Sequence, residues 1–150
     1  MDSYDVRIEQ LLKYNAIAES ALSNVSKLQS AYVLYNDNTC LKVGIAGPRR
    51  GKGAQERLKL HYSSNSKNSV LARHMEVDAE YGESRGFDFK DRRERQKFLA
   101  ENCHFRVLPL PDISRKELLT FEKILEKELN PRYKGRVTAK RTKISLASQS

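Results

Sequence analysis

Cysteine is scarce in this chain, with only 2 among 150 residues, Cys40 and Cys103. Two cysteines cannot form a disulfide framework and are too few for a cysteine-based zinc site, so we expect buried, reduced thiols. His74 and His104 have no ligand-like spacing and should be structural or exposed. No apolar stretch approaches the roughly 18 residues of a membrane span, and the opening residues MDSYDVRIEQ lack the features of a secretory signal. The sequence therefore predicts an intracellular, cytoplasmic protein without a membrane span.

Acidic residues are outnumbered, and one region has none. The chain carries 28 Lys and Arg against 19 Asp and Glu, a formal net charge of +9, and residues 132–150 contain six basic residues and no acidic one. Such a surplus favours a nucleic-acid partner, although an anionic membrane surface or an acidic protein would also be attracted. The loop GPRRGKG adds three basic residues but lacks the spacing of a P-loop. The residues expected to contact the phosphates of a nucleic acid are Arg49, Arg50, Lys52, Arg132, Lys134 and Arg136.

The pattern of apolar and turn residues predicts one small α+β domain. Residues 2–28 have helical spacing, as one amphipathic helix or as two with a break near Asn15. A β-hairpin follows around the turn NDNT. The remaining expected elements are helices at 54–62, 70–77, 89–102 and 115–129, a loop at 81–88 and a third strand at 103–110. The expected architecture is a mostly antiparallel sheet of about three strands flanked by helices, with the last helix capped by Ser114 and Glu117.

Glu122 occupies an unusual position in the last predicted helix. It comes four residues after Leu118 and three before Leu125, so it points along the apolar stripe rather than toward solvent. A carboxylate there is unfavourable unless it is paired, protonated or bound to a cation. Two interpretations stay open: an edge carboxylate that pairs with a nearby arginine, and a carboxylate that binds a cation.

Two further pairs of residues could meet a phosphate. Arg57 and His61 are spaced i, i+4 and share a helix face, from which arginine can donate forked hydrogen bonds and histidine can exchange a proton. Tyr32 and Lys42 lie on the two strands of the hairpin, and the strand register decides whether they share a face. By themselves, a solvated basic face and a purely structural pair are the simpler interpretations.

Taken in order and spacing, these residues resemble the GIY-YIG nuclease family. Members of that family have a strand with Gly-Ile-Tyr, a second strand with Tyr-Ile-Gly, and a helix with an arginine, often followed four residues later by a histidine. A later helix carries a glutamate and is followed by a proline. The matching residues in this chain are Tyr32, Gly44, Arg57, His61, Glu122 and Pro131. The resemblance spans about residues 30–133, which leaves 1–29 as a helical extension and 134–150 as a basic tail.

The chain departs from the family pattern in three ways. Ser30 and Ala31 replace the glycine and isoleucine of the first motif, whose role looks structural. Lys134 stands where the family often has an asparagine, and Asn130 precedes the proline instead. Lys42 replaces the tyrosine of the second motif, which is the departure nearest to the chemistry. This replacement is similar to the lysine that restriction-type members carry there.

The resemblance implies a DNA endonuclease that hydrolyses phosphodiester bonds with Mg²⁺ or Mn²⁺. It implies that Glu122 holds the metal and that Arg57 neutralises charge on the phosphate. Tyr32 is then a candidate base, Lys42 lowers the pKa of Tyr32, acts as the base or anchors water, and His61 is a second proton-handling group. The alternative is a catalytically inactive DNA-binding or interaction protein with the same fold. The N-terminal extension either covers the sheet or forms a homodimer contact.

Overall fold

The computed structural model describes residues 3–13, 27–47, 53–67 and 69–135. This part of the chain is α+β, with a small sheet of three antiparallel strands flanked by helices, as the sequence predicts. No helix in it is long and apolar enough to cross a membrane. In chain order the elements are α1 (Ser3–Lys13), β1 (Ser30–Asn36), β2 (Thr39–Ala46), α2 (Ala54–Ser63), α3 (Val70–Glu76), α4 (Ala79–Ser84), α5 (Arg92–Asn102), β3 (Cys103–Pro109) and α6 (Arg115–Leu129).

Strand β1 lies at the centre of the sheet, in the order β2-β1-β3, and pairs antiparallel with both neighbours. The hairpin turns at Asp37, whose φ of 52° lies in the left-handed region that aspartate tolerates better than most residues. Tyr32 lies opposite Gly44, and Leu34 lies opposite Lys42. A β-bulge then shifts the register. This register fixes which side chains of the hairpin share a face.

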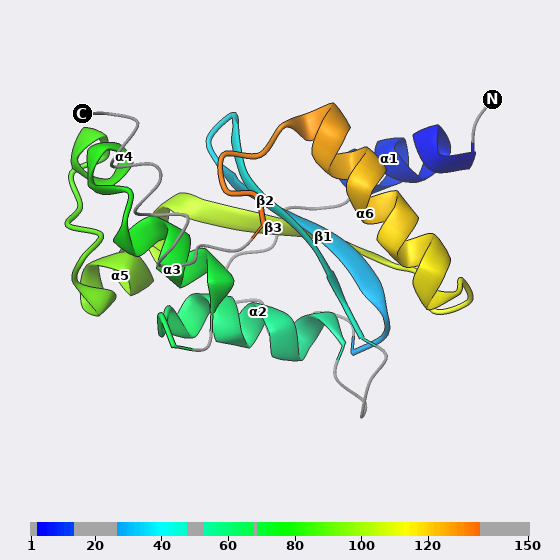
Figure 1. Ribbon diagram of the computed structural model, residues 1–150, viewed down its shortest axis with the longest axis horizontal. Coiled ribbons are helices and arrows are strands. Elements are labelled where there is room, and N and C mark those ends of the chain that lie inside the picture. Colours follow the sequence, from blue (N-terminus) through cyan, green and yellow to red (C-terminus); the bar gives the residue numbers. More distant parts are fainter. Residues whose placement is uncertain (1–2, 14–26, 48–52, 68, 136–150) are drawn as a thin grey trace.

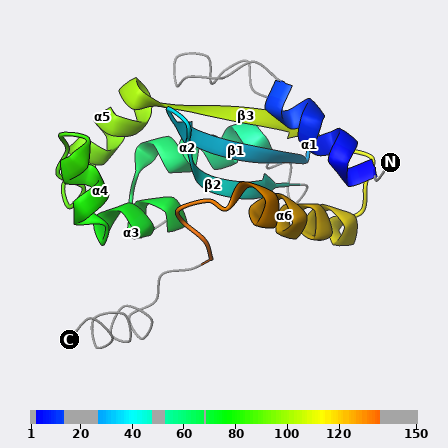
Figure 2. The same ribbon diagram turned by 90° about the horizontal axis from the view of Figure 1, so that it is seen from above.

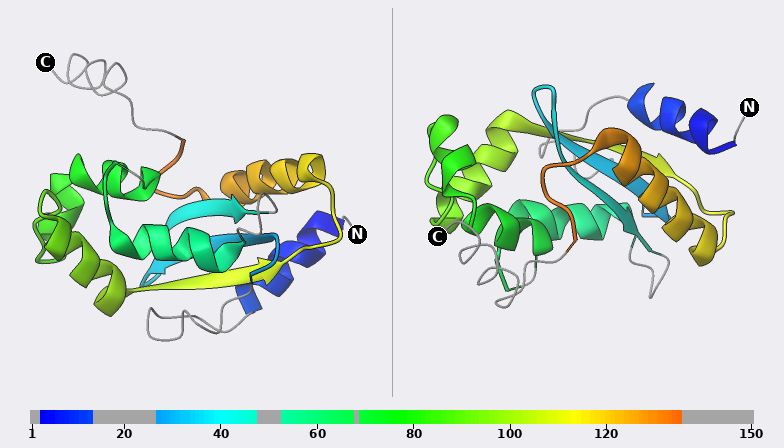
Figure 3. Two further views of the ribbon diagram at one scale, coloured as in Figure 1. Left: turned by 90° about the horizontal axis from the view of Figure 1, so that it is seen from below. Right: turned by 45° about the horizontal axis from the view of Figure 1, so that its top comes forward.

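Helices cover both faces of the sheet. On one face α1 packs against β3 and α6 packs against β2 (Figure 1). The other face carries α2, and the group α3, α4 and α5 lies at one end of the sheet (Figure 2). The left view of Figure 3, seen from below, shows α2 lying over the strands. The sheet therefore separates two hydrophobic layers.

The pleat of β1 divides the core into those two layers, because successive residues of a strand point to opposite faces. Ala31 and Val33 face α1 and α6, and they pack with buried residues of those helices that include Phe121. Tyr32 and Leu34 point the other way, into the larger cluster beneath α2 to α5. The side chain of Tyr32 thus belongs to the face of the sheet that α2 covers.

The chain after α6 returns to the hairpin. Asn130 ends the helix in the left-handed conformation, with φ of 46°. The backbone N–H groups of Arg132 and Tyr133 then donate to the carbonyls of Cys40 and Leu41, each at 2.9 Å. These bonds tie the residues after α6 to the part of β2 that contains the bulge.

Two predicted boundaries are wrong, and in both places tertiary packing overrides the local signal. The stretch 81–88, predicted as a loop, begins inside α4, because Tyr81 is buried and packs against Phe89 and Phe98. Helix α5 begins at Arg92 rather than at residue 89. Phe89 enters the core, and the Asp91 side chain caps the helix by accepting from a backbone N–H.

The predicted N-terminal helix is confirmed over the described residues. Helix α1 buries Leu11 against the sheet and contacts β3 and α6. This part of the extension therefore covers the sheet, which is one of the two roles expected for it. Residues 14–26, with the expected break near Asn15, lie outside the described residues.

Candidate active site

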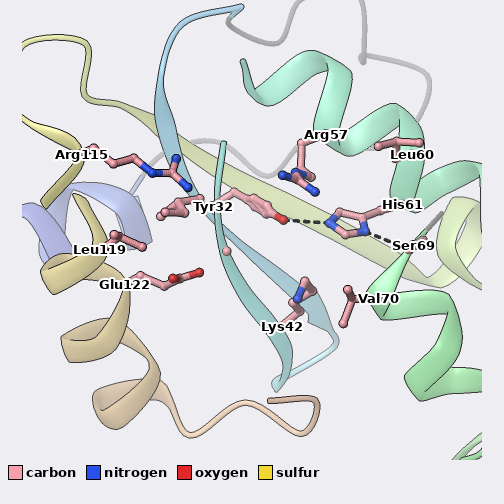
Figure 4. A pocket seen from close by; sticks show the side chains of 12 residues that line it. Tyr32, Lys42, Arg57, Leu60, His61, Ser69, Val70, Arg115, Leu119 and Glu122 are labelled. Carbon is pink, nitrogen blue, oxygen red and sulfur yellow. Dashed lines mark hydrogen bonds between the residues drawn. The ribbon is translucent and has the colours of Figure 1, made fainter. Parts of the chain in front are cut away.

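A cleft of about 210 Å³ opens at the β2 edge of the sheet. Its floor comes from β1 and β2, one wall from α2 and the start of α3, and the other wall from α6 (Figure 4). The candidate catalytic residues that line it are Tyr32, Lys42, Arg57, His61 and Glu122. The fold therefore brings all of them together, although they range from position 32 to position 122 of the sequence.

Tyr32 and Lys42 share the face of the hairpin that forms the cleft floor. Tyr32 is opposite Gly44, and Lys42 lies two residues from Gly44 on the same strand, so the two side chains are diagonal neighbours. The Tyr32 ring occupies the space above Gly44, where a β-carbon would collide with the ring and the hydroxyl. The glycine of the second motif thus has a packing role in this chain.

We expect Gly44→Ala to destabilise the protein by about 1–3 kcal/mol, because the added methyl group overpacks the site and displaces Tyr32. The free energy of unfolding in urea measures this effect. In a Tyr32→Leu background the same substitution should cost less than about half as much, because the colliding ring is gone. An equal cost in both backgrounds would show that Tyr32 does not need the space over Gly44.

A hydrogen-bonded chain of side chains runs from the cleft into the core. The Tyr32 hydroxyl lies 2.8 Å from His61 Nε2, and His61 Nδ1 lies 3.2 Å from Ser69 Oγ. Ser69 also caps α3 by accepting from a backbone N–H of that helix. Burial lowers the pKa of His61 well below its ordinary value, and the charges of Lys42 and Arg57 lower it further. The imidazole is therefore neutral at neutral pH.

Tyr32 holds its proton firmly in this environment. Burial raises the pKa of the Tyr32 hydroxyl well above its ordinary value, Arg57 opposes this rise and Glu122 adds to it. To lower this pKa is one of the three roles that the resemblance leaves open for Lys42, but in the structure the cation that lowers it is Arg57. The Tyr32 hydroxyl is thus suited to donate or accept a hydrogen bond rather than to lose its proton.

Glu122 projects from α6 into the cleft (Figure 4). Its side chain is half-buried, and among the described residues its carboxylate has neither a hydrogen bond nor an ion pair. Burial raises the pKa of this carboxyl and Glu126 raises it further, whereas Lys42, Arg115 and Arg57 lower it. Within this part of the chain, the interpretation as an arginine-paired carboxylate does not hold.

Lys42 and Arg57 bring positive charge to the same cleft. Arg57 is exposed and Lys42 is half-buried, and neither side chain forms a hydrogen bond or an ion pair within the described ranges. Burial lowers the pKa of the Lys42 ammonium, which Glu122 and Glu126 oppose and Arg57 reinforces. Unpaired charges of both signs around one cleft favour a ligand that is itself charged.

Four of the residues expected to contact phosphates lie outside the described residues: Arg49, Arg50, Lys52 and Arg136. Arg132 donates two hydrogen bonds to Asp78, at 2.7 and 3.1 Å, and its guanidinium lies 4.5 Å from the centre of the Tyr81 ring. Lys134 Nζ donates to Asn130 Oδ1 at 2.6 Å. These bonds fix the chain after α6, and any phosphate contact by Arg132 would compete with Asp78.

Sequence reasoning missed several side chains that line the cleft. Arg115 precedes Glu122 by seven residues, which is two helical turns, and this spacing on α6 could have identified it. Ser69 directly precedes a helix, where serine commonly acts as a cap. Leu60 and Leu119 are exposed on the two walls of the cleft, and no local pattern marks them.

The remaining cysteines and histidines have structural surroundings. Cys40 and Cys103 are free and buried, as predicted. His74 is buried and donates from Nε2 to the Gly135 carbonyl at 2.8 Å, and it stacks on a tyrosine ring. His104 is half-buried and also stacks on a tyrosine. None of these side chains lines the cleft.

The chemistry of the cleft suits reactions at a phosphate ester. Such reactions need cations that neutralise charge on the phosphate, an oxygen ligand for a hard metal ion, and groups that orient water and accept its proton. The cleft is lined by the cations Arg57 and Lys42, by the carboxylate of Glu122 and by the hydroxyl of Tyr32, which are groups of these kinds. No protein-family model, no curated protein and no solved structure matches the chain.

Proposed function

We propose that the protein is a metal-dependent DNA endonuclease of the GIY-YIG type, which hydrolyses phosphodiester bonds in the cytoplasm. One observation carries the proposal. Lys42, Arg57 and Glu122 line one cleft without a partner among the described residues, next to the hydrogen-bonded pair Tyr32–His61. The unpaired charges of the half-buried Lys42 and Glu122 are unfavourable for folding, so the binding of a ligand explains their presence better than a contribution to stability does. The net charge of +9 suits a DNA substrate.

Mg²⁺ or Mn²⁺ fits the group that Glu122 offers. Hard cations prefer oxygen ligands, and Mg²⁺ is often held by one or two carboxylates together with water and substrate phosphates. Within the described residues, no three His, Cys, Asp or Glu side chains gather into a metal site. Glu122 would therefore be the ligand that this part of the chain supplies. When bound, the ion would act as a Lewis acid on the scissile phosphate.

Arg57 would bind the scissile phosphate. Its exposed guanidinium can donate two parallel hydrogen bonds to the non-bridging oxygens and neutralise the charge that grows on them in the transition state. Tyr32 lies on the floor of the same cleft, where its hydroxyl can orient the attacking water while His61 fixes the ring. Because Tyr32 stays protonated and His61 stays neutral, this pair has a positioning role in the proposal.

Lys42 is our candidate for the base. Burial and the charge of Arg57 lower its pKa, which increases the fraction of neutral amine. The amine would accept a proton from water while the water oxygen forms a bond to phosphorus and the bond from phosphorus to the leaving oxygen breaks. In this mechanism Lys42 does the work of the tyrosine that is missing from the second motif.

Incubation with supercoiled plasmid tests the proposal. We expect nicked or linear DNA in the presence of Mg²⁺ or Mn²⁺, and intact plasmid in EDTA, because the chemistry needs a divalent ion. Agarose gels that follow the loss of the supercoiled form measure the rate. DNA binding, measured by gel shift in EDTA, gives the affinity separately from cleavage.

Intact plasmid with both metals would contradict the proposal, and the binding data would then decide between two rivals. Strong DNA binding without cleavage would indicate an inactive DNA-binding protein of the same fold. The replacement of the motif tyrosine by Lys42 is the observation that favours this rival. Weak DNA binding without a metal effect would indicate a protein whose basic surface meets an acidic partner.

A further inference from the structure

We propose that Arg115 is a second phosphate-binding residue of the cleft, which binds the phosphate next to the scissile one on the same DNA strand. The inference rests on the proposed function and adds a substrate contact that the motifs do not contain. Arg115 lines the cleft from the first turn of α6 and is exposed. In Figure 4 its guanidinium enters from the α6 wall, whereas Arg57 enters from the α2 wall.

Most of the hydrogen-bonding capacity of Arg115 is unused. Its Nη1 donates to the Gly47 carbonyl at 2.7 Å, and this is the one hydrogen bond of the side chain within the described residues. A guanidinium has five N–H donors in a rigid fork. The bond to Gly47 therefore orients the group while it leaves donors free for an anion in the cleft.

The bond to Gly47 holds the Arg115 guanidinium on the α6 side of the cleft, across from Arg57 on the α2 side (Figure 4). Gly47 follows directly after β2, which ends at Ala46. Both arginines lower the pKa of Glu122, so both bring positive charge toward its carboxylate. Two guanidiniums on opposite walls can bind two successive phosphates of one strand, with the scissile phosphate at Arg57 and Glu122 and its neighbour at Arg115.

Apolar surface on both walls fits the sugars of the same strand. Leu60 on α2 is 37% exposed and Leu119 on α6 is 40% exposed, and both line the cleft. Leu60 comes three residues after Arg57, and Leu119 comes four residues after Arg115, so each wall presents an arginine and a leucine on one helix face. A DNA strand alternates charged phosphates with less polar sugars. Each wall therefore offers one contact for a phosphate and one for a sugar of that strand.

Single-turnover cleavage of a short duplex tests Arg115 directly. The position of the cut is first mapped with the wild-type protein. We expect Arg115→Gln to slow cleavage about tenfold or more, because hydrogen bonds between charged groups are strong. The matched control is Lys116→Gln, which makes the same charge change one residue later, outside the cleft. Its rate should stay within about twofold of wild type.

Methylphosphonate linkages, which remove the charge of one phosphate at a time, identify the contact. At one position next to the cut, this replacement should slow the wild type about as much as Arg115→Gln does and should not slow the variant further. At other positions the rate reductions caused by the methylphosphonate and by Arg115→Gln should multiply. If they multiply at every position, Arg115 only tethers Gly47 and the inference is wrong.

The same variants separate this inference from the proposed function. If the wild type binds duplex DNA but does not cut it, the nuclease proposal fails, and affinity in EDTA then tests Arg115 alone. Weaker binding by Arg115→Gln, with unchanged binding by Lys116→Gln, would still support a phosphate contact. Equal affinity of both variants and the wild type would overturn it.

Discussion

Glu122→Gln should reduce metal-dependent plasmid cleavage by roughly a thousandfold or more. The amide keeps the size of the side chain but removes the charged oxygen that would hold the metal, and a Lewis-acid metal ion supplies several kcal/mol of transition-state stabilisation. Cleavage rates at saturating Mg²⁺ measure the effect. Glu128→Gln is the matched control, because Glu128 is exposed on the same helix. Cleavage by the Glu122 variant at the wild-type rate would remove Glu122 from the mechanism.

The same substitution should leave thermal stability equal or higher. Because the pKa of Glu122 is raised in the folded protein, folding disfavours its charged form. This penalty is absent below the pKa of the unfolded chain, grows as the pH rises toward the folded pKa, and is complete above the folded pKa. Glutamine carries no charge and so removes the penalty. Lost activity together with an unchanged or raised Tm is the signature of a functional carboxylate, whereas a structural one would lower the Tm.

Arg95→Met should lower the free energy of unfolding by roughly 3 kcal/mol or more, because it removes a buried charge-assisted network. The side chain of Arg95 is 3% exposed. It donates to Ser64 Oγ at 3.1 Å, to the Ser64 carbonyl at 2.8 Å and to the Phe89 carbonyl at 2.8 Å. Methionine fills a similar volume but leaves these acceptors buried and unpaired. Urea denaturation followed by circular dichroism measures the change.

Arg93→Met provides the comparison for Arg95. Arg93 lies two residues earlier on α5 and is exposed, so its replacement should change the free energy of unfolding by less than about 0.5 kcal/mol. A loss of about 3 kcal/mol is a large part of the roughly 5–15 kcal/mol of a typical domain. Equal urea midpoints for the two variants would mean that the chain rearranges around the missing guanidinium at little cost.

Local signals explain which parts of the fold and the site are predictable from sequence. The hairpin follows from alternating apolar residues around a turn, and Ser114 caps α6 by accepting from the Glu117 N–H, as the capping box predicts. Glu122 stands out because helical periodicity alone places a carboxylate on an apolar stripe. The spacing of Arg57 and His61 places both on one face of α2, and both line the cleft.

Other parts of the site depend on long-range packing, which no local pattern records. The register that places Tyr32 over Gly44, and the contact between Tyr32 and His61, are set by the assembled sheet and α2. Arg95 stands within the highly charged run KDRRERQK at 90–97, and such runs commonly lie on a solvated face, yet its guanidinium is buried under the end of α2. Helical spacing from Phe98 and Leu99 places Arg95 on the buried face of α5, but its acceptors on Ser64 lie 31 positions earlier, and no local pattern records that contact.

The residues after α6 that hydrogen-bond to β2 also affect whether two copies of this protein can pair edge to edge. β2 is an edge strand, and free backbone groups at such an edge can add a strand from another molecule and start aggregation. The N–H groups of Arg132 and Tyr133 occupy the carbonyls of Cys40 and Leu41, next to a bulge that disturbs the edge further. The residues after α6 thus cover part of the β2 edge and hinder the addition of a strand from another molecule there.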